Sequence, residues 1–251
     1  MAEDRQREKT DRQLEDLCAR ALRGAVVHSK FLSPEAAQRL KNLAARQGLL
    51  CLAVGGGEGA ERCLCLLCRE EYGQPLPEEA PLRVLRIGFD PRFGSPGHRD
   101  LLGAMLGLGI ERDCLGDICL EEGCAYAAVY APMASFLCSN LEKAGRCSVT
   151  VEETDDPLPA PKAGKLQRVN VPSLRLDACL QQVLRLPRAK AQELVRAGRV
   201  QRNWEEETRT DALLAQGDMV SVRGAGRFRL LGVAGESRKN RLFIDVESFL
   251  K

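Results

Sequence analysis

The sequence of 251 residues predicts an α+β protein made of three successive segments. Apolar residues at helical spacing alternate along the chain with short apolar runs typical of strands. Two proline-rich stretches, at 73–81 and 155–165, interrupt this pattern, and proline both stiffens the chain and breaks hydrogen-bonded ladders. We therefore expect four regions in order: an N-terminal α/β cap at 1–74, a middle domain at 80–155, a linker at 156–164 and a C-terminal domain at 165–251.

The first segment contains two expected helices. In the first helix, apolar residues recur every three or four positions between Leu14 and Leu22. In the second helix, Ser33 is the N-cap, Pro34 lies in the first turn and Gly48 follows the end. Both helices present one apolar face.

Two apolar runs, at 49–54 and 63–67, predict strands in the same segment. The run Gly55–Gly59 lies between them. A phosphate-binding loop would end in Gly-Lys-Ser or Gly-Lys-Thr, and this run does not. We therefore expect a turn at these glycines.

The middle segment predicts six elements in the order β-α-β-β-α-β. They are a strand at Leu82–Phe89, a helix at Pro96–Leu108 capped by Ser95, strands at Asp117–Leu120 and Cys124–Tyr130, a helix at Pro132–Lys143 ending at Gly145, and a strand at Cys147–Glu152. This order is that of the ferredoxin-like βαββαβ plait. Because RNA-binding domains, enzymes and metal carriers all use the plait, it does not select a function by itself.

The third segment predicts two short helices followed by a small sheet. Ser173 is the expected cap of the first helix, and the second helix starts near Pro187 and stops at Gly198. Strands are expected at Val200–Trp204 and Met219–Arg223. Four basic residues should point outward around the ends of the second helix: Arg188, Lys190, Arg196 and Arg199.

The net charge of +2 conceals an asymmetry between the two parts of the chain. Residues 1–164 carry 20 Lys and Arg against 25 Asp and Glu, a net charge of −5, whereas residues 165–251 carry 17 against 10, a net charge of +7. A basic C-terminal third indicates a polyanionic partner, and the alternative is a solvated basic face without one.

The chain contains 11 cysteines, which we interpret as reduced thiols that serve as small apolar residues. The cluster of Cys63, Cys65 and Cys68 lacks the second ligand pair that a zinc site needs, so no metal and no cofactor are expected. The longest apolar stretch, Leu101–Ile110, is ten residues with three glycines, which is too short to span a membrane. The polar N-terminus shows no secretory signal, so we expect a cytoplasmic protein without a membrane partner.

The third segment resembles the S-four RNA-binding module, the αL motif named after a small-subunit ribosomal protein. The resemblance lies in Arg175-Leu176-Asp177, in the pattern from Arg188 to Asn203 (Arg-x-x-Ala-x-x-Leu-Val-x-x-Gly-x-Val-x-x-Asn) and in the pattern from Gly217 to Val222 (Gly-Asp-x-Val-x-Val). It implies a C-terminal S-four-type domain that binds RNA.

Three positions depart from that module. Pro187 stands where Ser or Thr is usual, Arg202 replaces an apolar strand residue, and Glu205–Glu207 replaces a turn that usually holds Gly and Lys. We expect the acidic triplet to weaken RNA contact at that edge.

The rest of the chain is similar to the bacterial YlmH family. The similarity lies in four stretches in the same order: Gly55–Arg62, His98–Ile110, Leu115–Ile118 and Val222–Phe228. It implies an N-terminal cap, a plait proposed to bind RNA and a C-terminal S-four module. It also implies a cytoplasmic, ribosome-associated protein, and related modules act at the large subunit when stalled nascent chains are rescued.

Together these observations predict a non-catalytic factor that binds structured RNA, rRNA or tRNA, on the ribosome. Arginine suits this work because its planar fork pairs with phosphate oxygens. The expected RNA-binding residues are Arg175, Arg188, Lys190, Arg196, Arg199, Arg202, Asn203, Arg223 and Arg227. Arg188 and Lys190 lie outside the apolar stripe of their helix, so we expect their replacement to leave the fold intact.

Two other functions remain open at this stage. One is an RNA-modifying enzyme of the pseudouridine synthase or methyltransferase type, and the other is a protein–protein adaptor whose basic face is incidental. The leading prediction includes no catalytic residue, no small-molecule substrate and a monomeric state.

Overall fold

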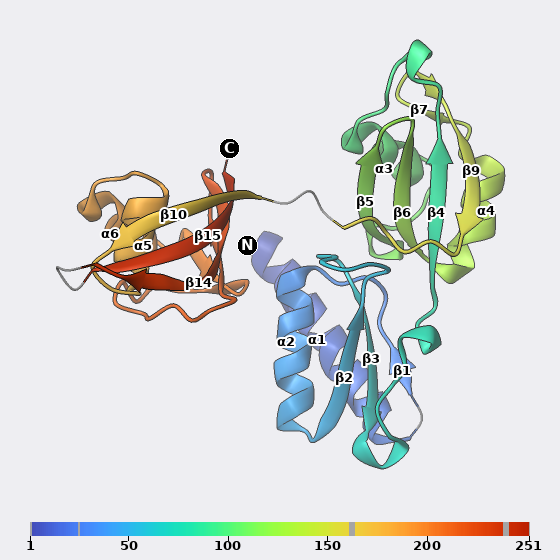
Figure 1. The fold of residues 1–251 in the computed structure, drawn as a ribbon. Coiled ribbons are helices and arrows are strands. Elements are labelled where there is room, and N and C mark those ends of the chain that lie inside the picture. The colour runs from blue at the N-terminus through green and yellow to red at the C-terminus, as the bar shows by residue number, and fades with distance from the viewer. Residues whose placement is uncertain (1, 25, 161–163, 238–240, 251) are drawn as a thin grey trace. The chain divides into compact units, whose positions relative to one another are not determined.

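The protein is described from a computed structural model that covers residues 2–24, 26–160, 164–237 and 241–250 (Figure 1). The chain divides into two compact units, Met1–Pro161 and Lys162–Lys251. Among the described residues, no helix has both the length and the apolar composition needed to cross a membrane.

The N-terminal part of the first unit packs two helices on a small antiparallel sheet. The helices are α1 (Ala2–Leu22) and α2 (Pro34–Arg46), and the strand order is β1-β3-β2, with β1 at Val27–His28, β2 at Leu49–Val54 and β3 at Leu64–Arg69. Apolar residues of both helices meet the sheet in one core, in which Cys18, Leu40 and Cys65 are fully buried.

Helix α2 begins as its sequence predicts. The Ser33 hydroxyl accepts a hydrogen bond from the Ala36 N–H at 3.3 Å, and Pro34 occupies the first turn. These contacts satisfy an N–H that has no partner within the helix. Because the cap is only three residues away, local sequence was sufficient to locate it.

The second part of the first unit is a four-stranded antiparallel sheet with two helices. Its strands have the spatial order β5-β6-β4-β9. The elements along the chain are β4 (Leu82–Gly88), α3 (His98–Gly107), β5 (Leu115–Glu121), β6 (Cys124–Tyr130), α4 (Ala134–Asn140) and β9 (Thr150–Thr154).

Both faces of this sheet are covered. Leu85 and Ile87 of β4 belong to the core that also contains Leu101 of α3 and Leu137 of α4. Val84, which points to the other face because side chains alternate along a strand, packs in a second core with residues of the N-terminal part, including Phe31, Leu64 and Leu66. The N-terminal part and the sheet therefore fold as one body.

Two helix boundaries in this part differ from the sequence expectation. Gly97, not Ser95, caps α3, and the Asp100 carboxylate accepts the Gly97 N–H at 2.9 Å. Helix α4 ends at Asn140, well before the expected end at Gly145.

The chain after α4 forms a hairpin instead of more helix. Strand β7 (Lys143–Ala144) pairs with β8 (Cys147–Ser148), so the expected strand over 147–152 is divided between β8 and β9. The spacing of Leu137, Leu141 and Ala144 fits a helix, but only Leu137 lies in α4, and Leu141 at the end of that helix and Ala144 of the hairpin reach the same core. The apolar pattern alone could not separate the two structures.

One arginine and one aspartate join the N-terminal part to the sheet. The Arg62 guanidinium donates to the carbonyl oxygens of Phe31 and Leu115, each at 3.0 Å. The Asp117 carboxylate accepts the backbone N–H of Glu61 at 2.5 Å and that of Arg62 at 3.3 Å. Burial, and after it the neighbouring Arg112, lowers the pKa of Arg62 to about 10, so the group stays charged at neutral pH.

Glycines allow backbone segments to approach one another closely where the N-terminal part meets the four-stranded sheet. A Cβ on Gly57 would lie 2.1 Å from the carbonyl oxygen of Leu158, and one on Gly116 would lie 2.6 Å from the Phe31 ring. The run Gly55–Gly59 is thus the expected turn, and it packs against the segment that follows β9.

The expected linker at 156–164 is therefore partly packed. Leu158 is only 3% exposed, and its N–H donates to the Gly56 carbonyl at 2.8 Å. Its apolar side chain completes the second core, which a proline-rich composition did not reveal. Residues 161–163 of that stretch lie outside the described residues.

The second unit contains two helices packed on one six-stranded antiparallel sheet. The strand order is β10-β15-β14-β13-β11-β12. The elements are β10 (Lys165–Val171), α5 (Leu176–Val183), α6 (Arg188–Arg196), β11 (Val200–Arg202), β12 (Glu205–Glu206), β13 (Met219–Val222), β14 (Gly226–Glu236) and β15 (Leu242–Leu250).

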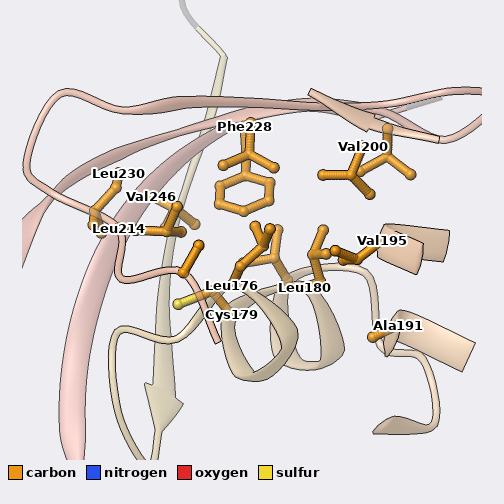
Figure 2. Close-up of a cluster of buried hydrophobic side chains, with 14 of the residues drawn as sticks. Leu176, Cys179, Leu180, Ala191, Val195, Val200, Leu214, Phe228, Leu230 and Val246 are labelled. Atoms are coloured by element: carbon orange, nitrogen blue, oxygen red, sulfur yellow. The ribbon is translucent and has the colours of Figure 1, made fainter. Parts of the chain in front are cut away.

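The core of the second unit centres on the Phe228 ring of β14. Figure 2 shows this ring directed from the sheet toward Leu176 and Leu180 of α5, with Val195 of α6 beside them. All four side chains are fully buried, and each contributes about 1.5 to 3 kcal/mol of apolar transfer free energy. The core consists of residues of this unit alone.

Two local expectations for the second unit are wrong. Arg175, not Ser173, is the N-cap of α5, because the first helical N–H groups donate to the carbonyls of Ala212 and Thr210 on a distant loop. The expected strand at Val200–Trp204 stops at Arg202, since Asn203 and Trp204 adopt positive φ values of 49° and 65° in the turn to β12.

The separate core generates a first prediction. A fragment of residues 164–251 should fold alone and unfold at the same temperature as this unit does in the whole chain. The single tryptophan, Trp204, lies in this unit, so its fluorescence reports the transition in both proteins. A fragment without a cooperative transition would show that its core needs the first unit.

The hydrogen bonds that Asp117 accepts generate a second prediction. Asp117→Ala leaves two N–H groups without an acceptor, which should lower the free energy of unfolding of the first unit by about 2 kcal/mol. Circular dichroism should show the lower transition while Trp204 fluorescence melts as before. Asp155→Ala, at an exposed position, is the control, and equal effects of the two variants would refute the assigned role.

Candidate nucleic-acid interface

The residues expected to bind RNA lie in the second unit, around α6 and the turns beside it. Arg175 precedes α5, and the others follow along the chain: Arg188, Lys190 and Arg196 in α6, Arg199 after it, Arg202 in β11, Asn203 in the next turn, Arg223 after β13 and Arg227 in β14. The structure divides them into residues with internal partners and residues directed to solvent.

A buried carboxylate binds two of the arginines. The Asp177 side chain is fully buried in the first turn of α5. It lies 3.1 Å from Arg175 Nε and 3.2 Å from Arg188 Nη2, and it also accepts a hydrogen bond from Gln192 Nε2 at 2.8 Å. Arg188 and Gln192 thus tie α6 to α5, and Arg175 binds the same carboxylate from the N-cap of α5.

The contact with Asp177 gives Arg188 a structural role that its place outside the apolar stripe did not predict. Its guanidinium compensates a charge that has left water, although 54% of the side chain remains exposed. Arg188 can face a ligand with its exposed part, but its position is set by Asp177. The sequence could have indicated this contact, because Arg188 and Gln192 share one helix face at a spacing of four residues.

The environment of Asp177 changes its pKa in two opposing ways. Burial by itself raises the pKa, but hydrogen bonds from Arg175, Gln192 and Arg188 outweigh burial and lower it to about 2. Asp177 is therefore ionised at neutral pH with its oxygens engaged. It cannot serve as a general acid or base near neutral pH.

A second carboxylate engages Arg202 and Asn203. Asp218 is almost completely buried and lies 2.7 Å from Arg202 Nε. The Asn203 amide donates to Asp218 at 2.7 Å, and its oxygen accepts the Met219 N–H at 2.9 Å. These contacts hold the turn after β11, so both side chains have a structural role whether or not they touch RNA.

The remaining basic residues of α6 are exposed. Lys190 pairs with Glu193 at 2.8 Å on the surface, which is a weak interaction in water. Within the described part of the chain, the Arg196 side chain has neither a hydrogen-bond nor an ion-pair partner. Arg199 donates one hydrogen bond to the Arg223 carbonyl at 3.1 Å, so these two residues stand together beyond the end of α6.

Two further contacts shape this surface. The Arg227 guanidinium lies 5.2 Å from the centre of the Phe249 ring, a cation–π contact that holds it against the sheet. The carboxylate of Glu206 packs against Gly198, where an added Cβ would lie 2.7 Å from it. A negative charge of the acidic triplet therefore lies beside the C-terminal end of α6.

The comparisons with known proteins agree on one family. The model of a domain described as "Putative RNA-binding domain in YlmH" matches residues 75–156. A Bacillus subtilis protein named ribosome-associated protein quality control protein P2 is 34% identical over 195 residues, which are 77% of this chain and 76% of that protein.

A solved structure supports the same assignment. The cell division protein ylmH from Streptococcus pneumoniae matches with a TM-score of 0.53 and 26% identity, over 61% of this chain and 92% of that one. The chain therefore belongs to the class of proteins that contain this domain, and in particular it is a member of the YlmH family.

The Asp177 cluster generates a third prediction. Folding lowers the pKa of Asp177 from its usual value near 4 to about 2, so the charged form stabilises the unit above pH 4 and the gain is lost as the pH falls toward 2. Asp177→Asn should lower the free energy of unfolding by about 2.5 kcal/mol at pH 7. The difference between variant and parent should shrink below pH 4, as measured by urea titrations of Trp204 fluorescence. A difference that is independent of pH would contradict the assigned ion pairs.

Proposed function

We propose that this protein is a non-catalytic RNA-binding factor that acts on the ribosome. The observation that carries the proposal is the cationic surface around α6, where exposed Lys190, Arg196 and Arg199 lie beside Arg188, which Asp177 holds in place. Its membership of the YlmH family and the names of its relatives support the same function. Association with ribosomes would place the protein in the cytoplasm.

The folds of the two units support this proposal. We assign residues 80–155 to the ferredoxin-like plait, supported by the order β5-β6-β4-β9 with two helices on one face. We assign residues 165–251 to the S-four type, supported by the helix pair α5–α6 that packs on the sheet.

Phosphate binding is the proposed mechanism. Guanidinium groups that are already oriented lose less conformational freedom when they pair with phosphate oxygens. Structured RNA is recognised largely through its backbone shape, which requires charges at defined positions more than contacts to base edges. We therefore propose rRNA or tRNA at the large ribosomal subunit as the ligand, during rescue or quality control of stalled ribosomes.

The buried acids argue against an RNA-modifying enzyme at this surface. A catalytic carboxylate needs access to substrate and a pKa matched to its task. Asp177 and Asp218 are instead enclosed and engaged by arginine and amide groups. They are suited to holding the basic side chains, which favours binding over chemistry.

The proposal generates a fourth prediction. Replacing Lys190 and Arg196 together with alanine should weaken binding to purified ribosomes without changing the Trp204 unfolding transition. Neither residue contacts Asp177 in the described structure, and each lost phosphate contact should reduce the slope of log affinity against log salt by about 0.7 to 0.9. The double variant should therefore flatten this slope by roughly 1.5.

The matched control removes two positive charges at the opposite edge of the sheet. Lys165 and Arg168 lie on β10, whereas α6 leads into β11 near the other edge. Lys165→Ala with Arg168→Ala should leave the salt slope close to that of the parent. Equal slopes for the parent and both double variants would refute the proposed phosphate contacts.

A further inference from the structure

A phenylalanine at one end of the first unit's four-stranded sheet is exposed to solvent. Phe93 ends a 3-10 turn, η3 (Pro91–Phe93), that follows β4, and 79% of it is exposed. No other large apolar side chain in the described part of the chain is as exposed. The aromatic face of Phe93 is therefore open to a ligand.

The turn that carries Phe93 is fixed by its own contacts. The Asp90 carboxylate accepts the Arg92 N–H at 3.0 Å, and Pro91 restricts the next position. Gly94 follows with a φ of 113°, and a Cβ there would lie 3.3 Å from the Cys147 sulfur. The backbone that carries the ring is therefore held in one conformation, which reduces the entropy lost on binding.

One basic side chain lies over the ring, and two more lie on segments near the turn that carries it. The Arg92 guanidinium lies 5.9 Å from the ring centre and is paired with Asp90. Arg99 lies in the first turn of α3 and Arg146 lies in the turn between β7 and β8, and both are exposed. In the part of the chain that the structure describes, neither of these two side chains has an ion-pair or hydrogen-bond partner.

These segments meet at the same end of the sheet, where Figure 1 shows β7 beside the end of β4. Gly145 packs on Asp100, with a would-be Cβ 3.0 Å from the carboxylate carbon, so the β7–β8 turn touches the first turn of α3. Gly123 of the β5–β6 turn lies beside Pro91, which places the acidic pair Glu121–Glu122 at the border of this region.

We propose that this region, the Phe93 surface formed by Phe93, Arg99 and Arg146, binds an unpaired RNA nucleotide. The base stacks on the exposed ring, and the two arginines contact the adjoining phosphates. An exposed aromatic flanked by unpaired arginines is the arrangement that single-stranded RNA requires, whereas an apolar protein partner would not need the cations. The inference rests on the proposed RNA-binding function and gives the first unit a specific ligand, a single-stranded segment.

The experiment compares the whole chain with three substitutions at Phe93. The probes are an oligouridine of about 12 nucleotides, which spans such a site, and protein-free 23S ribosomal RNA. Phe93→Ala and Phe93→Leu should each lower the affinity by about 5- to 100-fold, because leucine retains apolar area but no aromatic face. Phe93→Trp should bind as well as the parent or better.

One variant serves as a control, and a double variant tests the two arginines. Phe136→Ala removes an exposed phenylalanine from α4, a helix that packs on the same sheet. It should leave the affinities for oligouridine and for 23S ribosomal RNA unchanged. Arg99→Ala with Arg146→Ala should flatten the salt dependence of oligouridine binding by roughly 1.5, whereas Phe93→Ala should lower affinity without changing that dependence.

The outcomes separate this inference from the proposed function. If Phe93→Ala binds both probes like the parent while Lys190→Ala with Arg196→Ala binds them poorly, the Phe93 surface is refuted and the proposed function stands. If the parent protein binds no RNA, both fail. If Phe93→Ala weakens binding to intact ribosomes but not to either RNA, the partner is a ribosomal protein and the proposal is wrong.

Discussion

A carboxylate that water does not reach organises the surface around α5 and α6. An isolated charge in the position of Asp177 would cost several kcal/mol, and the fold compensates this cost with donors from Arg175, Arg188 and Gln192. The compensation has a functional consequence, because the two guanidinium groups are oriented before any ligand arrives. The surface therefore combines arginines fixed by a buried partner with side chains such as Arg196 that remain free to adapt.

The first unit follows a different constraint, which is close approach of backbone segments. Glycine at positions 57 and 116 lets the β2–β3 turn, the Phe31 segment and the Leu158 segment meet without side chains between them. The Arg62 guanidinium then satisfies carbonyl groups that this contact has removed from water. The glycine run between β2 and β3, which indicates only a turn in the sequence, thus connects the N-terminal part of the first unit to its four-stranded sheet.

The two units offer complementary chemistry for a polyanionic, base-containing ligand. The second unit presents cations suited to a phosphate backbone, and the first unit presents an aromatic ring beside cations, suited to an unpaired base. Phosphate contacts supply affinity and position, whereas stacking requires a base that is not paired. Neither arrangement needs a group poised for proton transfer.

The sequence by itself determined the α+β class, most helices and strands, the Ser33 cap and the basic character of the second unit, because these depend on spacing over a few residues or on composition. Tertiary structure decided the rest. Ser95 and Ser173 do not cap their helices, since Gly97 caps one and the N–H groups of the other find carbonyls near residue 211. Ala144 reaches the core through a hairpin where a helix was expected, and Arg188 of α6 meets Asp177 of α5. Local patterns indicate which side chains must be buried or paired. Which distant residues they contact is determined only when the elements pack against one another.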